Sequence, residues 1–322
     1  MNARDLMQAL DTEVSRVVVG KSAQLRIITA AILAEGHILL EDLPGVGKTT
    51  LVKSLSRALG CDSKRIQFTP DLLPSDVTGM NIFDRQTGSF RRLRGPVMTN
   101  LLLADELNRA IPRTQSALLE AMEEKQVTLD GETEALPAPF VVLATQNPVE
   151  TESTFRLPAA QMDRFLVCLS MGYPTQEEEC SMLRITGNAI PYENIQTVSS
   201  PAELCALQKQ VEDVFVSDEV LSYIVALCAA TRTHPDLRLG ASPRASRALY
   251  RIGKAYAAID GRDYVTPDDI RTLAQPVLCH RLMAGPDAMM SGKTAKDILS
   301  GILDSVPVPP QKEGLLAKTN EA

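Results

Sequence analysis

Residues 41–50 of the chain read EDLPGVGKTT, a glycine-rich turn that ends in a lysine and two threonines. An apolar run, ILLE at residues 38–41, leads into it, and a segment with helical periodicity follows. In a strand–loop–helix unit of this kind, backbone N–H groups and the start of the helix surround phosphate groups. The structural alternative is a glycine-rich turn that only connects a strand to a helix. The stretch predicts a nucleotide site, although Asp42 stands where the general loop pattern has its first glycine.

The loop is expected to supply several contacts to a nucleotide. Lys48 reaches the β- and γ-phosphates, and the hydroxyl of Thr49 can ligate Mg²⁺. Asp42 is a short polar residue that tolerates tight turns, yet it places a carboxylate near the phosphates. The predicted nucleotide contacts in the loop are Pro44, Gly45, Val46, Gly47, Lys48, Thr49 and Thr50.

Five short apolar runs alternate with helical segments in the first half of the chain. In TLVKSLSRALG, residues 50–60, leucine recurs at every fourth position and a glycine follows, which indicates an amphipathic helix and its end. Strands that alternate with helices form parallel sheets with helices on both faces. We therefore predict an α/β fold with a five-stranded parallel sheet, whose strands are residues 38–41, 65–68, 100–104, 140–145 and 165–169.

Two segments interrupt this alternation. Residues 80–96 and 126–139 are predicted to form hairpins that turn at residues 87–88 and 130–131. After residue 173 helical periodicity dominates, and TPDD at residues 266–269 is a strong helix start. We predict an α/β domain over residues 1–173 with both hairpins as insertions, a smaller all-helical domain over residues 174–306, and a flexible tail over residues 307–322.

The composition narrows the class of protein. The 322 residues include 33 Lys and Arg against 40 Asp and Glu, a net charge of −7, which argues against a protein that mainly coats nucleic acid. The six cysteines are scattered, so we expect reduced, mostly buried thiols. The N-terminus has no apolar signal region, and no segment reaches 18 consecutive apolar residues. We expect no membrane span and a cytoplasmic protein.

Acidic and amide side chains follow two of the predicted strands. LLLADE at residues 101–106 ends in Asp105 and Glu106, and acids at the carboxyl edge of a strand lie beside the phosphate loop in a doubly wound sheet. Asp105 can hold Mg²⁺ through water, and Glu106 can orient or deprotonate the attacking water. Asn147, which follows the next strand, can hydrogen-bond that water or the γ-phosphate. A solvated strand end or an ordinary turn is the alternative for each.

These motifs together resemble the AAA+ ATPases, and within them the MoxR branch. The resemblance covers roughly residues 18–281 and rests on EDLPGVGKT, LLADELNRA, IPRTQSALLEAMEEKQVTLDG, FVVLATQNPVE, LPAAQMDRF and GASPRA. It implies that Val19 and Gly20 lie near the adenine and that Asn147 is similar to a sensor-1 residue. Arg164 looks like the arginine finger offered to a neighbouring subunit, and Arg244 looks like the sensor-2 arginine. Whether Arg244 acts in its own subunit or in the next one stays open.

The resemblance also implies how the chain works. The hairpins resemble the helix-2 insert and the pre-sensor-1 hairpin of this clade, and the catalytic residues would be Glu106, Asn147, Arg164 and Arg244. The resemblance implies a protein that uses ATP and Mg²⁺ and that remodels or matures client proteins. It also implies a homo-oligomeric ring, for which six subunits are expected. A von Willebrand factor A-type partner and metal-cofactor insertion are further implications. In TFRLPAAQMDRF, Arg156 replaces a proline of the family pattern and Ala159 an acid, which affects the subunit contact around the finger.

Two other functions remain open from the sequence. A nucleic-acid-acting motor would use the arginines of the first hairpin, Arg85, Arg91, Arg92 and Arg94, which otherwise meet acids of a neighbouring subunit or a client. A nucleotide-sensing scaffold without enzymatic activity is the second alternative. The intact set of Lys48, Asp105 and Glu106 argues against it.

Overall fold

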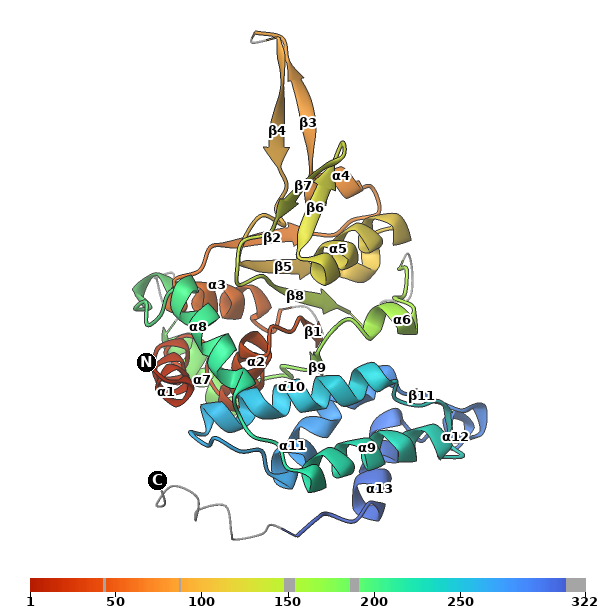
Figure 1. The fold of residues 1–322 in the computed structure, drawn as a ribbon. Coiled ribbons are helices and arrows are strands. Elements are labelled where there is room, and N and C mark those ends of the chain that lie inside the picture. Colours follow the sequence, from red (N-terminus) through yellow and green to blue (C-terminus); the bar gives the residue numbers. More distant parts are fainter. Residues whose placement is uncertain (43–44, 87, 148–153, 186–190, 311–322) are drawn as a thin grey trace, which may run out of the picture.

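The computed structural model describes residues 1–42, 45–86, 88–147, 154–185 and 191–310. A five-stranded parallel sheet in the order β2-β5-β8-β1-β9 forms the centre of the first half of the chain (Figure 1). The strands are β1 (Ile38–Glu41), β2 (Ser63–Gln67), β5 (Leu101–Asp105), β8 (Val141–Gln146) and β9 (Val167–Leu169). The predicted α/β fold is confirmed, with strand boundaries within two residues of those expected.

Both faces of the sheet are buried because its strands are almost continuously apolar. Successive side chains of a strand point to opposite faces, so Ile38 and Leu40 of β1 join one apolar cluster and Leu39 joins another. The first cluster is covered by α1 (Ala3–Val14), α2 (Ser22–Leu33) and α3 (Lys48–Ala58). The second cluster is covered by the layer that contains α4 (Pro74–Thr78) and α5 (Pro112–Glu124). Two short helical segments, η1 (Leu107–Arg109) and α6 (Ala159–Met162), complete this half.

The C-terminal half is mainly helical, as expected, with one correction. A short antiparallel pair, β10 (Leu237–Leu239) with β11 (Met283–Ala284), joins the α9–α10 connection to the chain before α12. Gly240, which follows β10, passes close to the end of α9, because a Cβ there would lie 2.6 Å from backbone atoms of that helix. The helices are α7 (Gln176–Ile185), η2 (Pro191–Asn194), α8 (Pro201–Glu212), α9 (Asp218–Thr233), α10 (Pro243–Ile259), α11 (Pro267–Leu278), η3 (Cys279–Arg281), α12 (Pro286–Met290) and α13 (Ala295–Ser305).

The two halves share one apolar core. Helix α10 packs against α1 and α2, and buried residues of all three belong to the same cluster as one face of the sheet. Leu249 and Ile252 of α10, Leu6 and Leu10 of α1, and Ile28 of α2 are all fully buried. The helical half is therefore fixed against the first face of the sheet by apolar burial.

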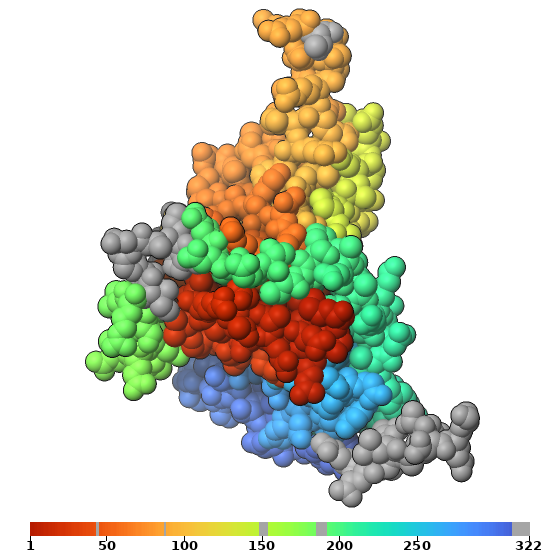
Figure 2. All heavy atoms as spheres, turned by 90° about the vertical axis from the view of Figure 1, so that its left-hand side faces the viewer, coloured from red at the N-terminus to blue at the C-terminus, as the bar shows by residue number. Residues whose placement is uncertain are grey.

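A long hairpin projects from the body of the molecule (Figures 1 and 2). It consists of β3 (Gly79–Asp84) and β4 (Ser89–Arg94), paired antiparallel; Thr87, at its expected turn, lies outside the described residues. A shorter hairpin, β6 (Gln126–Leu129) with β7 (Glu132–Ala135), turns at Asp130 and Gly131, both with positive φ.

The two hairpins are tied together by ion pairs. Arg92 contacts Glu132 at 2.9 Å and Glu134 at 3.2 Å, and Arg94 contacts Glu134 at 2.5 Å. Two of the four hairpin arginines therefore meet acids of their own chain, where acids of a neighbour or a client were expected. Charge neutralisation of this kind makes the hairpin a poorer contact for nucleic acid.

Two further expectations meet the limits of the described structure. Residues 311–322 of the expected flexible tail, 307–322, lie outside it. Within the ranges given above, no helix is both long enough and apolar enough to cross a membrane.

Candidate functional site

The phosphate loop follows the carboxyl end of β1 and opens α3. Gly45 and Gly47 have φ of 87° and 82°, conformations that favour glycine, and a Cβ at either position would meet no atom within 4 Å. Helix α3 begins after Gly47 without a side-chain cap, so its first amides remain suited to an anion. Lys48 Nζ donates to the carbonyl oxygen of Asp42 at 3.1 Å, which holds the lysine in the loop. Pro44 lies outside the described residues.

Asp42, which stands where the general loop pattern has its first glycine, has a structural role. Its buried carboxylate accepts hydrogen bonds from Ser170 Oγ at 2.7 Å and from the amides of Met171 at 2.7 Å and Gly172 at 3.1 Å. These residues follow β9, the neighbour of β1 in the sheet. The Asp42 carboxylate therefore joins the loop to the end of the adjacent strand and is already satisfied by three donors.

Asp105 and Glu106 lie at the same carboxyl edge of the sheet as the loop. Thr145 of β8 connects them, because its hydroxyl donates to Asp105 Oδ1 at 2.6 Å and accepts from the Glu106 amide at 2.9 Å. Arg65 of β2 binds Asp105 Oδ2 at 2.7 Å. The sheet thus presents two carboxylates in fixed positions on adjacent residues.

Glu106 is held in an unusual backbone conformation. Its φ is 57°, in the left-handed region that costs free energy for a residue with a side chain. Gln67 Nε2 donates to its Oε2 at 2.7 Å, and Arg109 Nε lies 2.9 Å from the same oxygen. Sequence reasoning missed Arg65 and Gln67, which alternate on β2; their polar alternation in an otherwise apolar sheet was the available signal.

The remaining residues assigned to the nucleotide are distributed around this edge. Asn147 directly follows β8, and its carbonyl oxygen accepts a hydrogen bond from Asn108 Nδ2 at 3.4 Å. Gly20, with φ of 72°, lies between α1 and α2, where a Cβ would fall 1.8 Å from the carboxylate of Glu178 in α7. Val19 precedes it. Because α7 follows the carboxyl end of β9, this turn lies toward the same edge.

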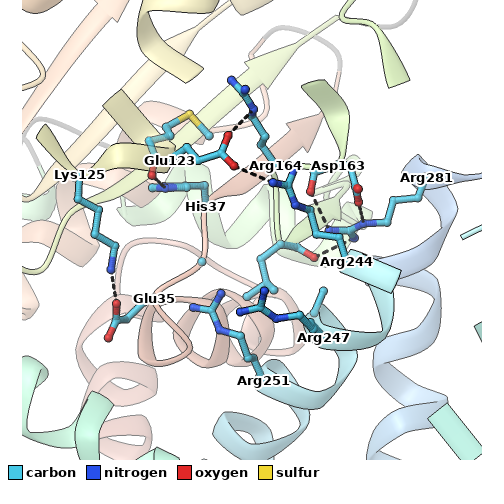
Figure 3. A pocket seen from close by; sticks show the side chains of 14 residues that line it. Glu35, His37, Glu123, Lys125, Asp163, Arg164, Arg244, Arg247, Arg251 and Arg281 are labelled. Atoms are coloured by element: carbon cyan, nitrogen blue, oxygen red, sulfur yellow. Dashed lines mark hydrogen bonds and ion pairs between the residues drawn. The ribbon is translucent and has the colours of Figure 1, made fainter. Parts of the chain in front are cut away.

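Arg164 and Arg244 meet at a single carboxylate. Arg164 Nε lies 3.0 Å from Oε2 of Glu123, and a terminal nitrogen of Arg244 lies 2.7 Å from Oε1 (Figure 3). Glu123 belongs to the last turn of α5 and lies within the stretch IPRTQSALLEAMEEKQVTLDG, but no role was assigned to it from the sequence. The structure thus brings together two arginines that are 80 residues apart in the sequence.

Asp163 holds the two arginine-bearing segments in register. Its Oδ2 accepts from Ser242 Oγ at 2.9 Å, and Ser242 is the N-cap of α10. Its Oδ1 pairs with Arg281 Nε at 2.6 Å, and Arg281 also donates to the carbonyl of Phe165 at 2.7 Å. Burial lowers the pKa of Arg281, and the ion pair with Asp163 opposes that shift.

The arginine pair lies at the amino-terminal edge of the sheet. His37 precedes β1. Its carbonyl oxygen accepts a hydrogen bond from the Leu166 amide at 2.8 Å, and its Nε2 donates to the carbonyl of Met122 at 3.0 Å. The phosphate loop follows the other end of β1. From residue 37 to residue 42 an extended strand spans roughly 17 Å. Arg164 and Arg244 therefore lie on the opposite edge of the sheet from Lys48 of the same chain.

Two histidines lie at this edge, His37, which is buried, and His280, which is half-buried. His37 accepts the Val142 amide on Nδ1 at 3.1 Å, and burial lowers its pKa to about 4. The Nε2 of His280 lies 3.2 Å from the carbonyl of Phe165, and burial lowers its pKa to about 3. Both rings are therefore neutral at pH 7.

A cavity of about 330 Å³ opens beside the arginine pair. It is lined by α5, α10, η3 and the segments that lead into β1 and β9, and most of its polar side chains are cationic (Figure 3). A basic cavity that contains Arg164, the predicted arginine finger, and Arg244, the predicted sensor-2 arginine, is suited to an anionic ligand.

Comparison with known proteins gives the class. The family model described as "ATPase family associated with various cellular activities (AAA)" matches residues 37–167, and the AAA lid domain model matches residues 229–302. The first range contains the phosphate loop, the acid pair and Arg164, and the second contains Arg244. The chain is an AAA-family protein with an AAA core and an AAA lid.

Within that class the chain belongs to the MoxR family. It is 39% identical to Chaperone MoxR1 of Mycobacterium tuberculosis, over 92% of this chain and 81% of that protein. It is 31% identical to Protein MoxR of Methylorubrum extorquens, over 95% and 96%. YeaC of Bacillus subtilis is 50% identical over 94% of each chain. A crystal structure of a candidate ATPase from Cytophaga hutchinsonii is similar with a TM-score of 0.90 and 39% identity, over 96% of both chains.

Proposed function

We propose that this chain is a Mg²⁺-dependent ATPase that hydrolyses ATP in a ring of identical subunits and uses the resulting motion to remodel client proteins. In this proposal the phosphate loop holds the triphosphate, with Lys48 at the β- and γ-phosphates. Glu106 orients or deprotonates the attacking water, and Asn147 positions it. Val19 and Gly20 lie beside the adenine.

The residues at the carboxyl edge fit a nucleotide with its metal ion. The positive-φ glycines leave an open cradle, and the uncapped start of α3 supplies amides. Thr49 and Asp105 carry the oxygen ligands that Mg²⁺ prefers, and Oδ1 of Asp105 keeps acceptor capacity beyond its bond from Thr145. Mg²⁺ supplies neutralisation of phosphate charge there. Arg65 and Thr145 keep the Asp105 carboxylate oriented for this role.

One observation carries the ring proposal: Lys48 and the pair Arg164–Arg244 lie on opposite edges of one sheet. Arginines so placed serve a nucleotide bound by another subunit, so we assign both to action in trans. This includes Arg244, whose mode of action was open from the sequence. The contact joins two different surfaces and closes into a ring, for which we propose six subunits.

Mixing variants tests this assignment. Lys48→Ala removes a subunit's own phosphate contact, and Arg164→Ala or Arg244→Ala removes what it offers to its neighbour. Each variant alone should be inactive. At equal, random mixing, roughly a quarter of the contacts would combine an intact Lys48 with an intact arginine from the neighbour, so activity should partly return.

The matched control is Lys48→Ala mixed with Glu106→Gln. Both changes affect a subunit's own nucleotide site, so no contact in the mixed ring is complete and activity should stay absent. Recovery with Arg164→Ala but not with Arg244→Ala would place Arg244 in cis. No recovery with either arginine variant, in rings shown to be mixed, would reject the trans geometry.

The cellular role is proposed from the relatives and from the hairpins. One relative is named a chaperone, and the projecting β3–β4 hairpin is a suitable element to contact a client. Magnesium-chelatase subunits are more distant relatives, at 27% identity over 74% of this chain for the tobacco protein, which favours metal-cofactor insertion as one task. We propose a von Willebrand factor A-type partner and, from the free cysteines, a cytoplasmic location.

A further inference from the structure

The cavity at the amino-terminal edge has more positive charge than its own carboxylates can balance. Three carboxylates line it, from Glu35, Glu123 and Asp163. Six cationic side chains line it: Lys125, Arg164, Arg244, Arg247, Arg251 and Arg281. The lining therefore has an excess of three positive charges.

The ion pairs show where this excess lies. Asp163 is paired with Arg281 and Glu35 with Lys125, so these charges balance. Glu123 serves two arginines with one negative charge. Among the described residues, no carboxylate lies within ion-pairing distance of Arg247 or Arg251. The unbalanced charge thus belongs to the Arg164–Arg244 pair and to these two arginines of α10.

Arg247 is placed to reach a ligand held by Arg244. The two are three residues apart on α10 and therefore lie on one face of the helix. Figure 3 shows the side chains of Arg247 and Arg251 side by side in the cavity. Arg251 is partly committed, since it donates to the carbonyl of Ala34; burial lowers its pKa, and the charge of Arg247 adds to that effect. Arg247 is exposed, and no described group accepts a hydrogen bond from it.

We propose that the cavity is a polyphosphate site in which Arg247 is a third phosphate ligand and Glu123 occupies the place of a phosphate until one arrives. This inference rests on the trans arrangement proposed above. Glu123 binds one arginine with each oxygen, as two oxygens of a phosphate group would. A triphosphate has more charge and more acceptor oxygens than one carboxylate, so it displaces Glu123 from the pair. The cavity volume lies within the usual range for ligand sites.

Binding of tripolyphosphate to the free subunit tests the proposal directly. Tripolyphosphate is titrated into the Lys48→Ala chain, because this change weakens phosphate binding at the chain's own phosphate loop. Isothermal calorimetry measures the affinity at low salt, where charge effects are largest. Removing Arg247 should weaken binding by about tenfold or more, and Arg247→Glu should weaken it further. Glu123→Gln should tighten binding severalfold, because the competing charge is gone while the side-chain shape is kept.

Two exposed residues of the same chain serve as matched controls. Arg238 of β10 has no carboxylate partner among the described residues and does not line the cavity, and Glu124 is the neighbour of Glu123 on α5. Arg238→Ala and Glu124→Gln should leave tripolyphosphate binding unchanged. Urea unfolding of every variant separates a lost ligand from a lost fold, and an exposed arginine is readily replaced.

Each outcome decides a definite point. Unchanged binding in both Arg247 variants would reject Arg247 as a ligand, and unchanged or weaker binding in Glu123→Gln would reject the role of Glu123. If binding does not depend on Arg164 and Arg244 either, the cavity is no polyphosphate site. The mixed-ring experiment judges the trans mechanism separately. Recovery of activity there, together with insensitivity to Arg247 here, would leave the proposed function standing and remove only this inference.

Discussion

The hydroxyl of Thr145 lies 2.6 Å from Oδ1 of Asp105 and is the point at which strand β8 is joined to the acidic end of β5. The same oxygen receives the amide hydrogen of Glu106 at 2.9 Å. Thr145 is fully buried, so water does not replace it as a partner. One hydroxyl therefore fixes the orientation of Asp105 and stabilises the left-handed backbone of Glu106.

Thr145→Val should disturb both acids while keeping the side-chain shape. Loss of the hydroxyl leaves a carboxylate oxygen and an amide without their partner, which should cost about 1–3 kcal/mol in the free energy of unfolding. Turnover should fall by about tenfold or more, because the acids are no longer held in place. Thr145→Ser keeps the hydroxyl and is the control. Equal activity of the valine and serine variants would show that this hydroxyl has no catalytic consequence.

Glu106→Gln should separate nucleotide binding from hydrolysis. The amide keeps a hydrogen-bond acceptor for Gln67 but lacks the charge that activates water. We expect ATP affinity close to that of the unaltered chain and hydrolysis slower by about 10²-fold or more. Equilibrium binding of a fluorescent nucleotide and phosphate release measure the two quantities. Unimpaired turnover would remove Glu106 as the catalytic carboxylate.

Asp42→Asn should destabilise the protein although the residue borders a nucleotide loop. Three donors converge on the buried carboxylate, and an asparagine amide turns donors toward some of them. The free energy of unfolding should fall by about 2–4 kcal/mol. The control is Asp213→Asn, at an exposed helix end, which should change it by less than about 0.5 kcal/mol. Loss of nucleotide affinity with stability unchanged would instead assign Asp42 to the ligand.

Stability should fall in mild acid because of the buried His37 and the half-buried His280. Burial depresses the pKa of His37 to about 4 and of His280 to about 3, below the ordinary value of 6.5. Below pH 6.5 both histidines become protonated in the unfolded chain, whereas in the folded chain they stay neutral until the pH approaches their lowered pKa values. Their contribution to stability is complete above that pH and declines as pH falls toward the folded pKa values. The slope is about 1.4 kcal/mol per pH unit for each histidine.

Urea unfolding at pH 7.5 and pH 5.0 measures this effect. The loss between the two pH values should be about 2 kcal/mol smaller in His37→Asn than in the unaltered chain, because asparagine does not titrate. His280→Asn should show the same reduction. Each variant is compared with itself at the two pH values, so a loss of stability that is equal at both values does not affect the comparison. An identical pH dependence in all three proteins would contradict the assignment.

The ion pairs between the hairpins should affect local order more than global stability. Arg94→Ala removes one contact to Glu134, and exposed pairs of this kind contribute about 0.2–1 kcal/mol. Hydrogen exchange of the β3–β4 amides should accelerate in the double variant Arg92→Ala/Arg94→Ala, while exchange in the central sheet stays the same. Arg91→Ala, on the same strand, is the control. Equal exchange in both would show that the pairs do not order the hairpin.

The sequence predicted the central sheet well because each strand is a short, continuously apolar run bounded by helical periodicity. It also predicted Lys48, Asp105 and Glu106 as site residues, because Asp105 and Glu106 directly follow a predicted strand and Lys48 ends the loop between a predicted strand and a helix. Glu123 was not found. Its role depends on partners 41 and 121 positions away, which only the tertiary fold brings to the end of α5. Local patterns do not encode such distances.

Asp42 shows a second kind of limit. From the sequence it is an acid beside a phosphate loop. The sequence leaves open whether this acid impairs phosphate binding or is a harmless variant of the loop pattern. Which way the carboxylate points is decided by the chain after β9, 128 residues further on. The arginines of the longer hairpin show the same limit. Their acidic partners were expected in other molecules, whereas the acids that bind Arg92 and Arg94 lie in the shorter hairpin of the same chain.

A short path of backbone and ion pairs connects the arginine cavity with the far end of the molecule. Only Lys125 separates α5, whose last turn carries Glu123, from β6, and the acids of the β6–β7 hairpin grip β4. A six-residue strand extends roughly 20 Å, so a tilt of α5 by about 10° would swing the tip of the longer hairpin by roughly 3–4 Å. A subunit whose glutamate is released by its neighbour's nucleotide would thus move its own hairpin, and a ring would pass successive strokes around its circumference.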